Sequence, residues 1–498
     1  MDYLTSAQLV KITIGAETPF GLRLASDFEP GASQGSSNDN EADLLIVNKV
    51  LRLVPGKRLV AKSTWRGHEV IAKLFFQKHH WERHFKRECA GLRLTNEAKL
   101  LTPKLLGQGN LATGNGFCII TEDLVDALPL GELTAEAGQL PDKLMDQMLK
   151  LVAQCHDFGI WQQDIHLDNF LCSANQLYII DAAEIRHSKT RTPLDHKARM
   201  DNLALLFSQF PVSNDQQLDS LMAQYNLHCS KEPLIKNTHK LDHQLIAARR
   251  KRLEKYRRKL MRTSTAHQVK RSTDCFAIFD RALDGQLLTE FMQTPDQLIA
   301  QGILLKDGNT STVAQITRGN KSYVVKRYNI KGFWHLVTRQ FGRRRALNSW
   351  CASFMLNLLG ISVPRSFIVM ERRHLRWIVG ESYLLCELAA GSRIDELVRD
   401  SGTDPITRQS IIDVFREFFY VMQRSRLSHG DCKATNFIFG PGRLTVLDLD
   451  AVKFHKTAIG YKRDFRKDLG RFARNWHADE SCQAFNSEVN RLVATFES

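Results

Sequence analysis

The sequence predicts an α+β protein with two successive domains of one plan, each a small β-rich part followed by a mainly helical part. Three observations predict this fold. The chain has 498 residues, enough for two or three domains of roughly 100–200 residues each. Short apolar runs of β type precede helical patterns, and this order occurs twice. A set of polar residues also recurs at a constant offset of 267 residues.

Composition and charge limit the classes of function. Apolar residues make up 43% and charged residues 25% of the chain, as in ordinary globular proteins. The net charge of +15 favours an anionic partner without choosing among nucleic acid, membrane and phosphorylated substrate. Aromatic-interleaved or recognition-helix patterns are absent from the sequence, so no nucleic-acid partner is expected.

The cysteines and the apolar runs indicate a compartment. The ten cysteines include no C-x-x-C pair, which fits neither a zinc ribbon nor a disulfide framework, so we expect reduced thiols. The chain start does not resemble a signal peptide, and no run approaches the ~18 apolar residues of a spanning helix. We therefore expect a cytoplasmic protein, free or peripheral at a membrane.

Patterns along the chain predict four segments. The polar stretch GASQGSSNDNEA at 31–42 predicts a flexible linker. In 249–271, eleven Lys or Arg surround Leu253, Tyr256 and Leu260 at helical spacing, which predicts a basic helix, either a solvated connector or an anion-attracting surface. The predicted segments are an N-terminal segment with linker at 1–44, a first domain at 45–235, a basic helical connector at 236–275 and a second domain at 276–498.

The recurring polar residues form the constellation D-x4-N…D. In the first half it reads WQQDIHLDNFLCSANQLYIIDAAEI, and in the second LSHGDCKATNFIFGPGRLTVLDLDAV. This spacing is that of a kinase catalytic loop followed by a metal-binding aspartate. A hydroxyl acceptor needs a carboxylate to orient it and take its proton, and Mg²⁺ prefers oxygen ligands. The matched pairs are Asp164 with Asp431, Asn169 with Asn436, and Asp181 with Asp448.

A strand lysine precedes each constellation. Lys73 ends VIAK and Lys326 ends YVVK, where each ammonium is predicted to hold nucleotide phosphates. Glu88, fifteen residues before Pro103, is the predicted partner of Lys73. The corresponding residue of the second half is Ser349, so that half lacks the glutamate, and its lysine is either held differently or serves a weak domain.

Phosphate-covering loops are less distinct. The second half has KDGNTSTV, in which glycine lets backbone N–H groups approach phosphate. The predicted contacts there are Gly308, Thr310, Ser311 and Thr312. The first half has only VPGKRLVAKST, a poorer match.

The second half resembles the lipopolysaccharide core kinase family. The matching stretches are VVKRYNIKGFWHLV, RRRALNSWCASFMLNLLGISVPRS, SHGDCKATNF and VLDLDAVKF, over most of 303–475. The first half is similar but more remote, through VIAKLF, QQDIHLDNFL and YIIDAAEI over roughly 45–207. The resemblance implies two tandem protein-kinase-like domains, each with a β-rich N-lobe and a helical C-lobe. It also implies ATP and Mg²⁺ as cofactors, a heptose or Kdo hydroxyl as acceptor, and action at the cytoplasmic face of the inner membrane.

The resemblance also assigns roles by position. Asp431 and Asp164 become the catalytic aspartates, and Lys433 stands near the γ-phosphate, with His166 as its counterpart. Asn436, Asp448, Asn169 and Asp181 become metal ligands, and Lys326 and Lys73 hold the nucleotide. Three departures stand out: Gln162 replaces the usual loop histidine, Phe-Gly follows neither metal aspartate, and Asp450 rivals Asp448.

Two other functions remain open from the sequence, a Ser/Thr/Tyr protein kinase and a scaffold with one or both domains inactive. Lys433 favours the first, while Ser349 and Gln162 each favour the second for one domain. For the leading reading, the partner is an anionic glycolipid, the lipopolysaccharide core. We hypothesise that Arg343, Arg344 and Arg345, with the basic helix, bind it. The active domain and the oligomeric state stay undetermined.

Overall fold

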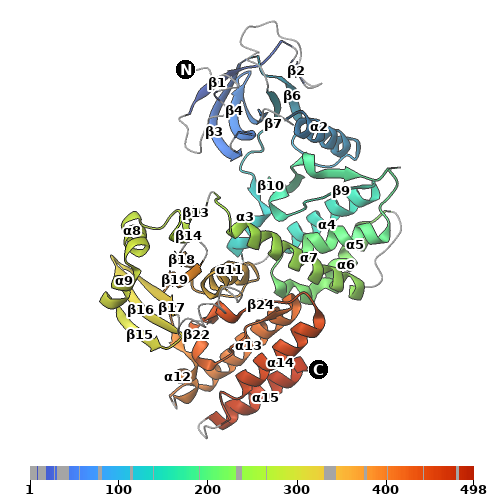
Figure 1. Cartoon of the computed structure of the whole chain (residues 1–498). Helices are drawn as coiled ribbons and strands as arrows, with labels where there is room; N and C mark the ends of the chain where they lie inside the picture. The colour runs from blue at the N-terminus through green and yellow to red at the C-terminus, as the bar shows by residue number, and fades with distance from the viewer. Residues whose placement is uncertain are drawn as a thin grey trace. The chain divides into compact units, whose positions relative to one another are not determined.

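The computed structural model divides the chain into two compact units (Figure 1). The first unit is Met1–Phe210 with Gln216–Leu245, and the second is Pro211–Asp215 with Ile246–Ser498. The structure describes residues 8, 18–26, 28–30, 44–54, 56–76, 81–112, 116–137, 140–189, 191–230, 238–264, 266–329, 344–374, 378–400, 402–440, 442–477 and 482–497. The predicted linker at 31–42 lies outside these residues. Both units mix strands and helices, as the sequence predicts.

The first unit begins with a seven-stranded antiparallel sheet of order β1-β3-β4-β5-β7-β6-β2. Its strands and the helix between them are β1 Phe20–Arg23, β2 Glu29–Pro30, β3 Leu44–Val54, β4 Arg58–Trp65, β5 His68–Phe75, α2 Trp81–Glu97, β6 Leu105–Asn110 and β7 Phe117–Glu122. The elements that follow are β8 Leu128–Pro129, α3 Leu130–Ala137, α4 Asp142–Asp157, β9 Ile160–Gln162, η1 Leu167–Asn169, β10 Phe170–Ser173, β11 Gln176–Ile179, η2 Ala182–Glu184, β12 Ile185–His187, α5 His196–Phe207 and α6 Leu218–His228. Two further elements, η3 Val212–Gln217 and α7 Thr238–Leu260, contain residues of both units.

The second unit repeats this order, with a seven-stranded antiparallel sheet β13-β14-β18-β19-β17-β16-β15. The elements of its sheet part are β13 His267–Arg271, β14 Cys275–Asp280, α8 Gly285–Gln293, α9 Pro295–Gln301, β15 Ile303–Gly308, β16 Ser311–Arg318, β17 Lys321–Tyr328, α11 Arg345–Leu358, β18 Ser366–His374 and β19 Ile378–Glu387. Its remaining elements are β20 Ser392–Arg393, α12 Ile394–Arg399, α13 Pro405–Ser425, β21 Leu427–Ser428, η4 Ala434–Asn436, β22 Phe437–Gly440, β23 Arg443–Val446, η5 Leu449–Ala451, β24 Lys453–Phe454, α14 Ala458–Ala473 and α15 Gln483–Glu497.

The two-residue period of a strand decides which face each side chain occupies. On β5, Val70, Ala72 and Leu74 point into the apolar core of the first sheet. On β17, Tyr323 and Val325 pack into the core formed with α8 and α9. Tyr328 points to the other face, where it joins the core that includes α11. Lys73 and Lys326 therefore lie on the faces opposite Val70 and Tyr323, turned toward α2 and α11.

Three boundaries in the structure differ from the predicted ones: the start of the first domain, the end of the basic helix and the start of the second domain. Strands β1 and β2 lie before residue 45 but already pair with β3 and β6 of the first sheet. The basic helix was predicted to reach residue 271, but α7 ends at Leu260. His267–Arg271 instead pairs with β14 as the edge strand of the second sheet. Basic side chains are common on edge strands, which explains why Lys270 and Arg271 resembled part of a charged helix.

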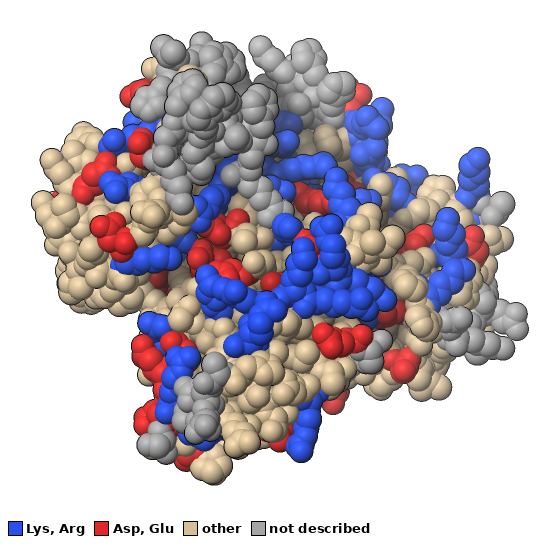
Figure 2. Space-filling view, turned by 60° about the horizontal axis from the view of Figure 1, so that its bottom comes forward, with Lys and Arg blue, Asp and Glu red and all other residues tan. Residues whose placement is uncertain are grey.

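Helix α7 carries its basic residues in two different environments. Arg249 is fully buried and donates two hydrogen bonds to Asp215, at 2.8 and 2.9 Å. Lys251, Arg258 and Lys259 are exposed. On the face shown in Figure 2, Lys and Arg side chains gather in a broad patch with acidic side chains among them. Within the described residues, no helix combines the length and apolar character needed to cross a membrane.

Candidate active sites

The first unit brings together three of the predicted residues from distant parts of the chain. The Lys73 ammonium on β5 lies 2.7 Å from Glu88 Oε1 on α2 and 3.6 Å from Asp181 Oδ1, which follows β11. Glu88 is buried at 5% exposure. A buried carboxylate is stabilised by a paired cation, so α2 and the turn after β11 both help to hold the lysine.

The loop between β9 and β10 is hydrogen-bonded to the segment after β11 that carries Asp181. Asn169 Nδ2 donates to the main-chain oxygen of Asp164 at 3.1 Å. The Ile180 N–H donates to the main-chain oxygen of Asn169 at 2.9 Å. Asp181 has φ 61° and ψ 59° in the left-handed region, a conformation that aspartate tolerates better than most residues. Hydrogen bonds therefore join the loop of Asp164 and Asn169 to the residue that directly precedes Asp181.

Gln162 makes the contact that a histidine makes in the second unit. Its Nε2 donates to the Ile180 oxygen at 2.7 Å. In the second unit, His429 Nε2 lies 2.9 Å from the Leu447 oxygen. Ile180 and Leu447 each directly precede a predicted metal aspartate. The amide of Gln162 can thus replace the imidazole as a structural donor, which weakens Gln162 as a sign of an inactive domain.

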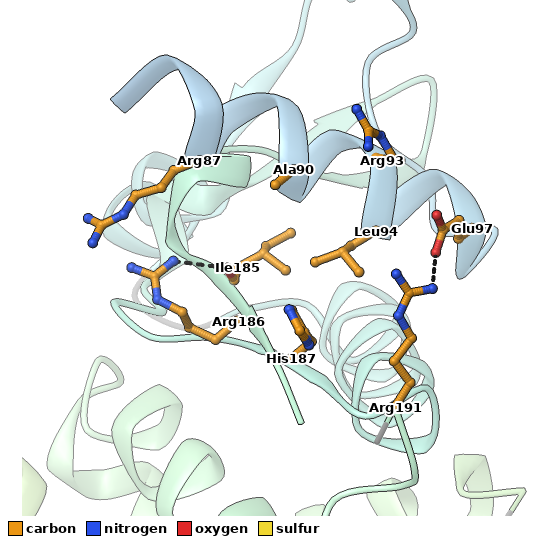
Figure 3. A pocket seen from close by; sticks show the side chains of 9 residues that line it. All are labelled: Arg87, Ala90, Arg93, Leu94, Glu97, Ile185, Arg186, His187 and Arg191. Carbon is orange, nitrogen blue, oxygen red and sulfur yellow. Dashed lines mark hydrogen bonds and ion pairs between the residues drawn. The ribbon is translucent and has the colours of Figure 1, made fainter. Parts of the chain in front are cut away.

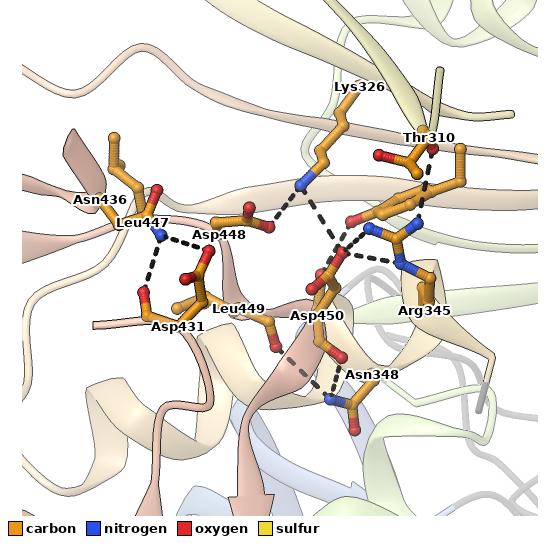
Figure 4. A network of polar contacts seen from close by, with 12 residues as sticks. Thr310, Lys326, Arg345, Asn348, Asp431, Asn436, Leu447, Asp448, Leu449 and Asp450 are labelled. Atoms are coloured by element: carbon orange, nitrogen blue, oxygen red, sulfur yellow. Dashed lines mark hydrogen bonds and ion pairs between the residues drawn. The ribbon is translucent and has the colours of Figure 1, made fainter. Parts of the chain in front are cut away.

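Lys326 of the second unit is held by carboxylates of the turn after β23 (Figure 4). Its ammonium lies 2.6 Å from Asp448 Oδ1 and 3.9 Å from Asp450 Oδ2. Burial alone would lower the pKa of Lys326, but the Tyr328 hydroxyl and the two carboxylates outweigh it, so this pKa is raised. Burial likewise favours neutral Asp448, yet Lys326 lowers its pKa overall. The pair is therefore charged at neutral pH.

The missing glutamate of the second unit is replaced by a different arrangement. Ser349 accepts or donates a 2.9 Å hydrogen bond with the Tyr328 hydroxyl. One turn earlier on α11, Arg345 binds Asp450 Oδ2 through Nε at 2.9 Å and Nη2 at 2.5 Å. The first unit has Ala183 where the second has Asp450. Compared with the first unit, the second unit therefore has its carboxylate on the turn, as Asp450, instead of on the helix, and it has an arginine on the helix.

The Asp431 loop is held by a buried aspartate of α14. The N–H groups of His429 and Gly430 donate to Asp468 at 2.6 and 2.9 Å. Asn436 Nδ2 donates to the Asp431 main-chain oxygen at 2.9 Å. Lys433 Nζ lies 2.9 Å from Asp431 Oδ2. Asp431, Lys433 and Asn436 therefore form one cluster, and Asp468 holds the two backbone N–H groups that directly precede Asp431.

The donor sets suit a hard divalent cation. Asn169 and Asn436 use their amide nitrogens for the loop, which leaves each carbonyl oxygen for another partner. Asp181 Oδ1 is buried and accepts no hydrogen bond from the described residues, although Lys73 lies near it. An Asn carbonyl beside an Asp carboxylate is an oxygen set that Mg²⁺ accepts.

The predicted phosphate-covering residues divide into exposed and buried ones. Gly308 and Thr310 lie at the turn between β15 and β16, and Thr310 is exposed. Ser311 is only 3% exposed. Thr312 is also buried, and its hydroxyl donates to Asp307 at 3.1 Å. Ser311 and Thr312 are therefore less accessible to a ligand than Thr310, because both residues are buried.

The arginine cluster predicted to bind anionic lipid is largely committed elsewhere. Arg344 pairs with the buried carboxylate of Glu371, and Arg345 pairs with Asp450. Arg343 lies outside the described residues. Residues 308–370 contain no acidic residue, but Glu371 follows this stretch directly and Asp450 comes from the turn after β23. Arg344 and Arg345 are therefore ion-paired within the second unit, which weakens this prediction for them without testing it.

A buried histidine supports the first loop and makes it sensitive to pH. His156 Nε2 lies 3.0 Å from Asn202 Oδ1, and Asn202 Nδ2 donates to the main-chain oxygen of Gln162 at 2.8 Å. Burial lowers the pKa of His156 to about 4. The unfolded chain takes up this proton near pH 6.5, whereas the folded unit does not, so stability falls as the pH falls below 6.5.

Between pH 6.5 and 5.5 the first unit should lose about 1 kcal/mol of unfolding free energy from His156. Hydrogen exchange of the α4 amides at both values measures this loss. A His156→Gln variant, which cannot titrate, should show a correspondingly smaller difference between the two pH values. An equal pH dependence in both proteins would show that His156 is not responsible.

No protein-family model matches this chain, and no curated protein matches it. Among solved structures, one described as "WaaP in complex with acyl carrier protein" matches at 19% identity and a TM-score of 0.31. The match covers 42% of this chain and 88% of that chain. A likeness of this degree identifies no family for this chain, and the acyl carrier protein is a partner of that structure alone.

Proposed function

We propose that the chain is an ATP- and Mg²⁺-dependent phosphotransferase made of two tandem protein-kinase-like domains. The observation that carries the proposal is a long-range convergence that occurs twice. A strand lysine meets an aspartate far along the chain, Lys73 with Asp181 at 3.6 Å and Lys326 with Asp448 at 2.6 Å. Such a pair is the arrangement that holds nucleotide phosphates and metal together in kinases.

The chain's own residues suggest a division of roles. Asp431 would accept the hydrogen bond of an acceptor hydroxyl and then its proton, and Lys433 beside it would balance the charge. Asp164 would do the same in the first unit. When bound by Asn436 and Asp448, or by Asn169 and Asp181, Mg²⁺ would neutralise charge on the phosphoryl group. Lys326 and Lys73 would orient the phosphates.

For the acceptor, we propose a heptose or Kdo hydroxyl of the lipopolysaccharide inner core. The support is the motif resemblance over 303–475 together with the net charge of +15. We further propose peripheral contact with the inner membrane through the exposed basic side chains of α7, namely Lys251, Arg258 and Lys259. Arg344 and Arg345 have no part in this contact because both are ion-paired.

Label transfer from γ-labelled ATP tests the proposal. The full chain is incubated with Mg²⁺ or with EDTA, and with dephosphorylated lipopolysaccharide core or a generic protein substrate. We expect Mg²⁺-dependent label on the core alone. Label on the protein substrate but not on the core would reject the sugar acceptor and support a protein kinase. ATP binding without transfer to core, protein or the chain itself would reject the phosphotransferase.

A further inference from the structure

A pocket outside the candidate active sites lies in the first unit, between α2 and the segment that begins at β12 (Figure 3). Its volume is about 450 Å³, within the range of pockets that take small molecules. Ala90, Leu94 and Ile185 supply apolar parts of the lining. Ile185 and Leu94 are buried, so this part of the pocket is a packed surface.

The charged lining of the pocket is strongly positive. Four arginines line it, and Arg191 and Arg186 are paired with Glu97 and Glu184, so the charges of Arg87 and Arg93 are not balanced by an ion pair within the described residues. Arg191 pairs with Glu97 at 2.6 Å. Arg87 forms no hydrogen bond or ion pair with any residue in the part of the chain that the structure describes. An arginine whose N–H donors are not used inside the protein is suited to bind an anion in a pocket.

The guanidinium groups are arranged at two ends of the pocket. In Figure 3, Arg87 on α2 and Arg186 on β12 extend to the same end, while Arg191 meets Glu97 at the other. The His187 ring lies between them. Arg186 Nη1 donates to the main-chain oxygens of Ala183 and Ile185 at 2.8 and 2.9 Å. These bonds hold its guanidinium in place, and an ion pair with Glu184 at 3.4 Å from Nη2 offsets part of its charge.

We propose that this pocket binds the phosphate group of a small ligand, with Arg87 and Arg186 as the phosphate-binding side chains. Arginine suits this role because its planar donors match phosphate oxygens and it stays charged at all physiological pH values. The volume exceeds that of a phosphate ion and leaves room for a sugar-sized remainder between His187 and the Glu97–Arg191 pair. Glu97 would accept hydrogen bonds from hydroxyl groups of that remainder.

The pocket joins two elements that also hold the first candidate active site. Arg87 directly precedes Glu88, the partner of Lys73. Arg186 follows Asp181 by five residues along the same turn. A phosphate bound to both arginines would connect α2 to the segment after Asp181. Ligand binding should therefore also protect α2 from local opening, because a ligand stabilises the state that binds it.

Calorimetric titration of the full chain without ATP tests the site, and it does not depend on the proposed phosphotransfer. The probes are inorganic phosphate, a hexose 6-phosphate and the same hexose without phosphate, at constant ionic strength. We expect saturable binding of the phosphorylated probes and none of the plain hexose. Tighter binding of the hexose phosphate would assign the pocket to a sugar phosphate, and tighter binding of inorganic phosphate would assign it to the free ion.

Variants separate this site from general attraction of anions. Arg87→Ala should weaken phosphate binding about 10- to 100-fold, since it removes charge-assisted hydrogen bonds. Arg83→Ala is the matched control, because Arg83 is exposed on the same helix and does not line the pocket. Arg87→Lys keeps the charge and guards against a folding defect. Equal weakening by the Arg83 and Arg87 variants, or no saturable binding by the wild type, would overturn the proposal.

Discussion

Replacing Asp164 and Asp431 together with Ala should lower phosphate transfer from ATP about 10²- to 10⁴-fold, the usual contribution of a positioned general base. Each aspartate sits in a loop whose shape does not depend on its own carboxylate alone. Asn169 and Asn436 bind the main-chain oxygens of these aspartates. The loops should therefore keep their shape in the variant, and ATP affinity should change little.

The single variants divide the activity between the units. Since both units contain the lysine, asparagine and two aspartates, we expect each single variant to retain the transfer rate of the other unit. Asp168→Ala is the control, because Asp168 lies in the first loop with a side chain 67% exposed. It should transfer phosphate like the wild type. A double variant with wild-type transfer would exclude both aspartates as catalytic bases.

Local patterns predicted the parts of the sites that follow from strand period and loop spacing. The alternation in HEVIAKLF turns Lys73 away from the apolar core of the sheet, and the fifteen-residue spacing to Pro103 selected Glu88. The structure brings these two side chains to 2.7 Å. The repeat itself was the strongest guide, because identical spacing in two halves requires two similar turns.

The rest depends on contacts that no local pattern records. Arg345 and Asp450 are 105 residues apart, and each one alone resembled something else, a surface arginine and a rival metal ligand. The signal that was available is a compensating pair of changes: Glu88 and Ala183 in the first half become Ser349 and Asp450 in the second. Reading both changes together would have predicted a relocated carboxylate.

Replacing Gly91 with Ala should destabilise the first unit by about 3 kcal/mol or more, through overpacking and the loss of a buried ion pair. A Cβ at this position on α2 would lie 1.9 Å from the main-chain oxygen of Ala182 and 2.5 Å from its carbonyl carbon. These atoms are backbone, so α2 itself must move away from the turn. Glu88 lies one turn earlier on the same helix and would move with it, away from Lys73.

Hydrogen exchange of the α2 amides and urea unfolding measure this effect, with Gly470→Ala as the matched control. Gly470 also lies within a helix, α14, but a Cβ there meets no atom within 4 Å. Alanine favours helix over glycine by up to about 1 kcal/mol, so the control should be neutral or stabilising. Faster exchange in α2 for Gly91→Ala alone would separate close packing from helix propensity.

The same substitution has a natural counterpart in the second unit, where Ala352 occupies the position that matches Gly91. There α11 contacts the turn after β23 through a side chain. Asn348 Nδ2 donates to the main-chain oxygens of Asp450 and Val452 at 2.9 and 3.0 Å. An asparagine tether leaves room for a methyl group that direct backbone packing excludes. Gly91→Ala should therefore leave exchange in α11 unchanged. If α2 exchange is also unchanged, α2 does not pack directly on Ala182, and the position of Glu88 needs another cause.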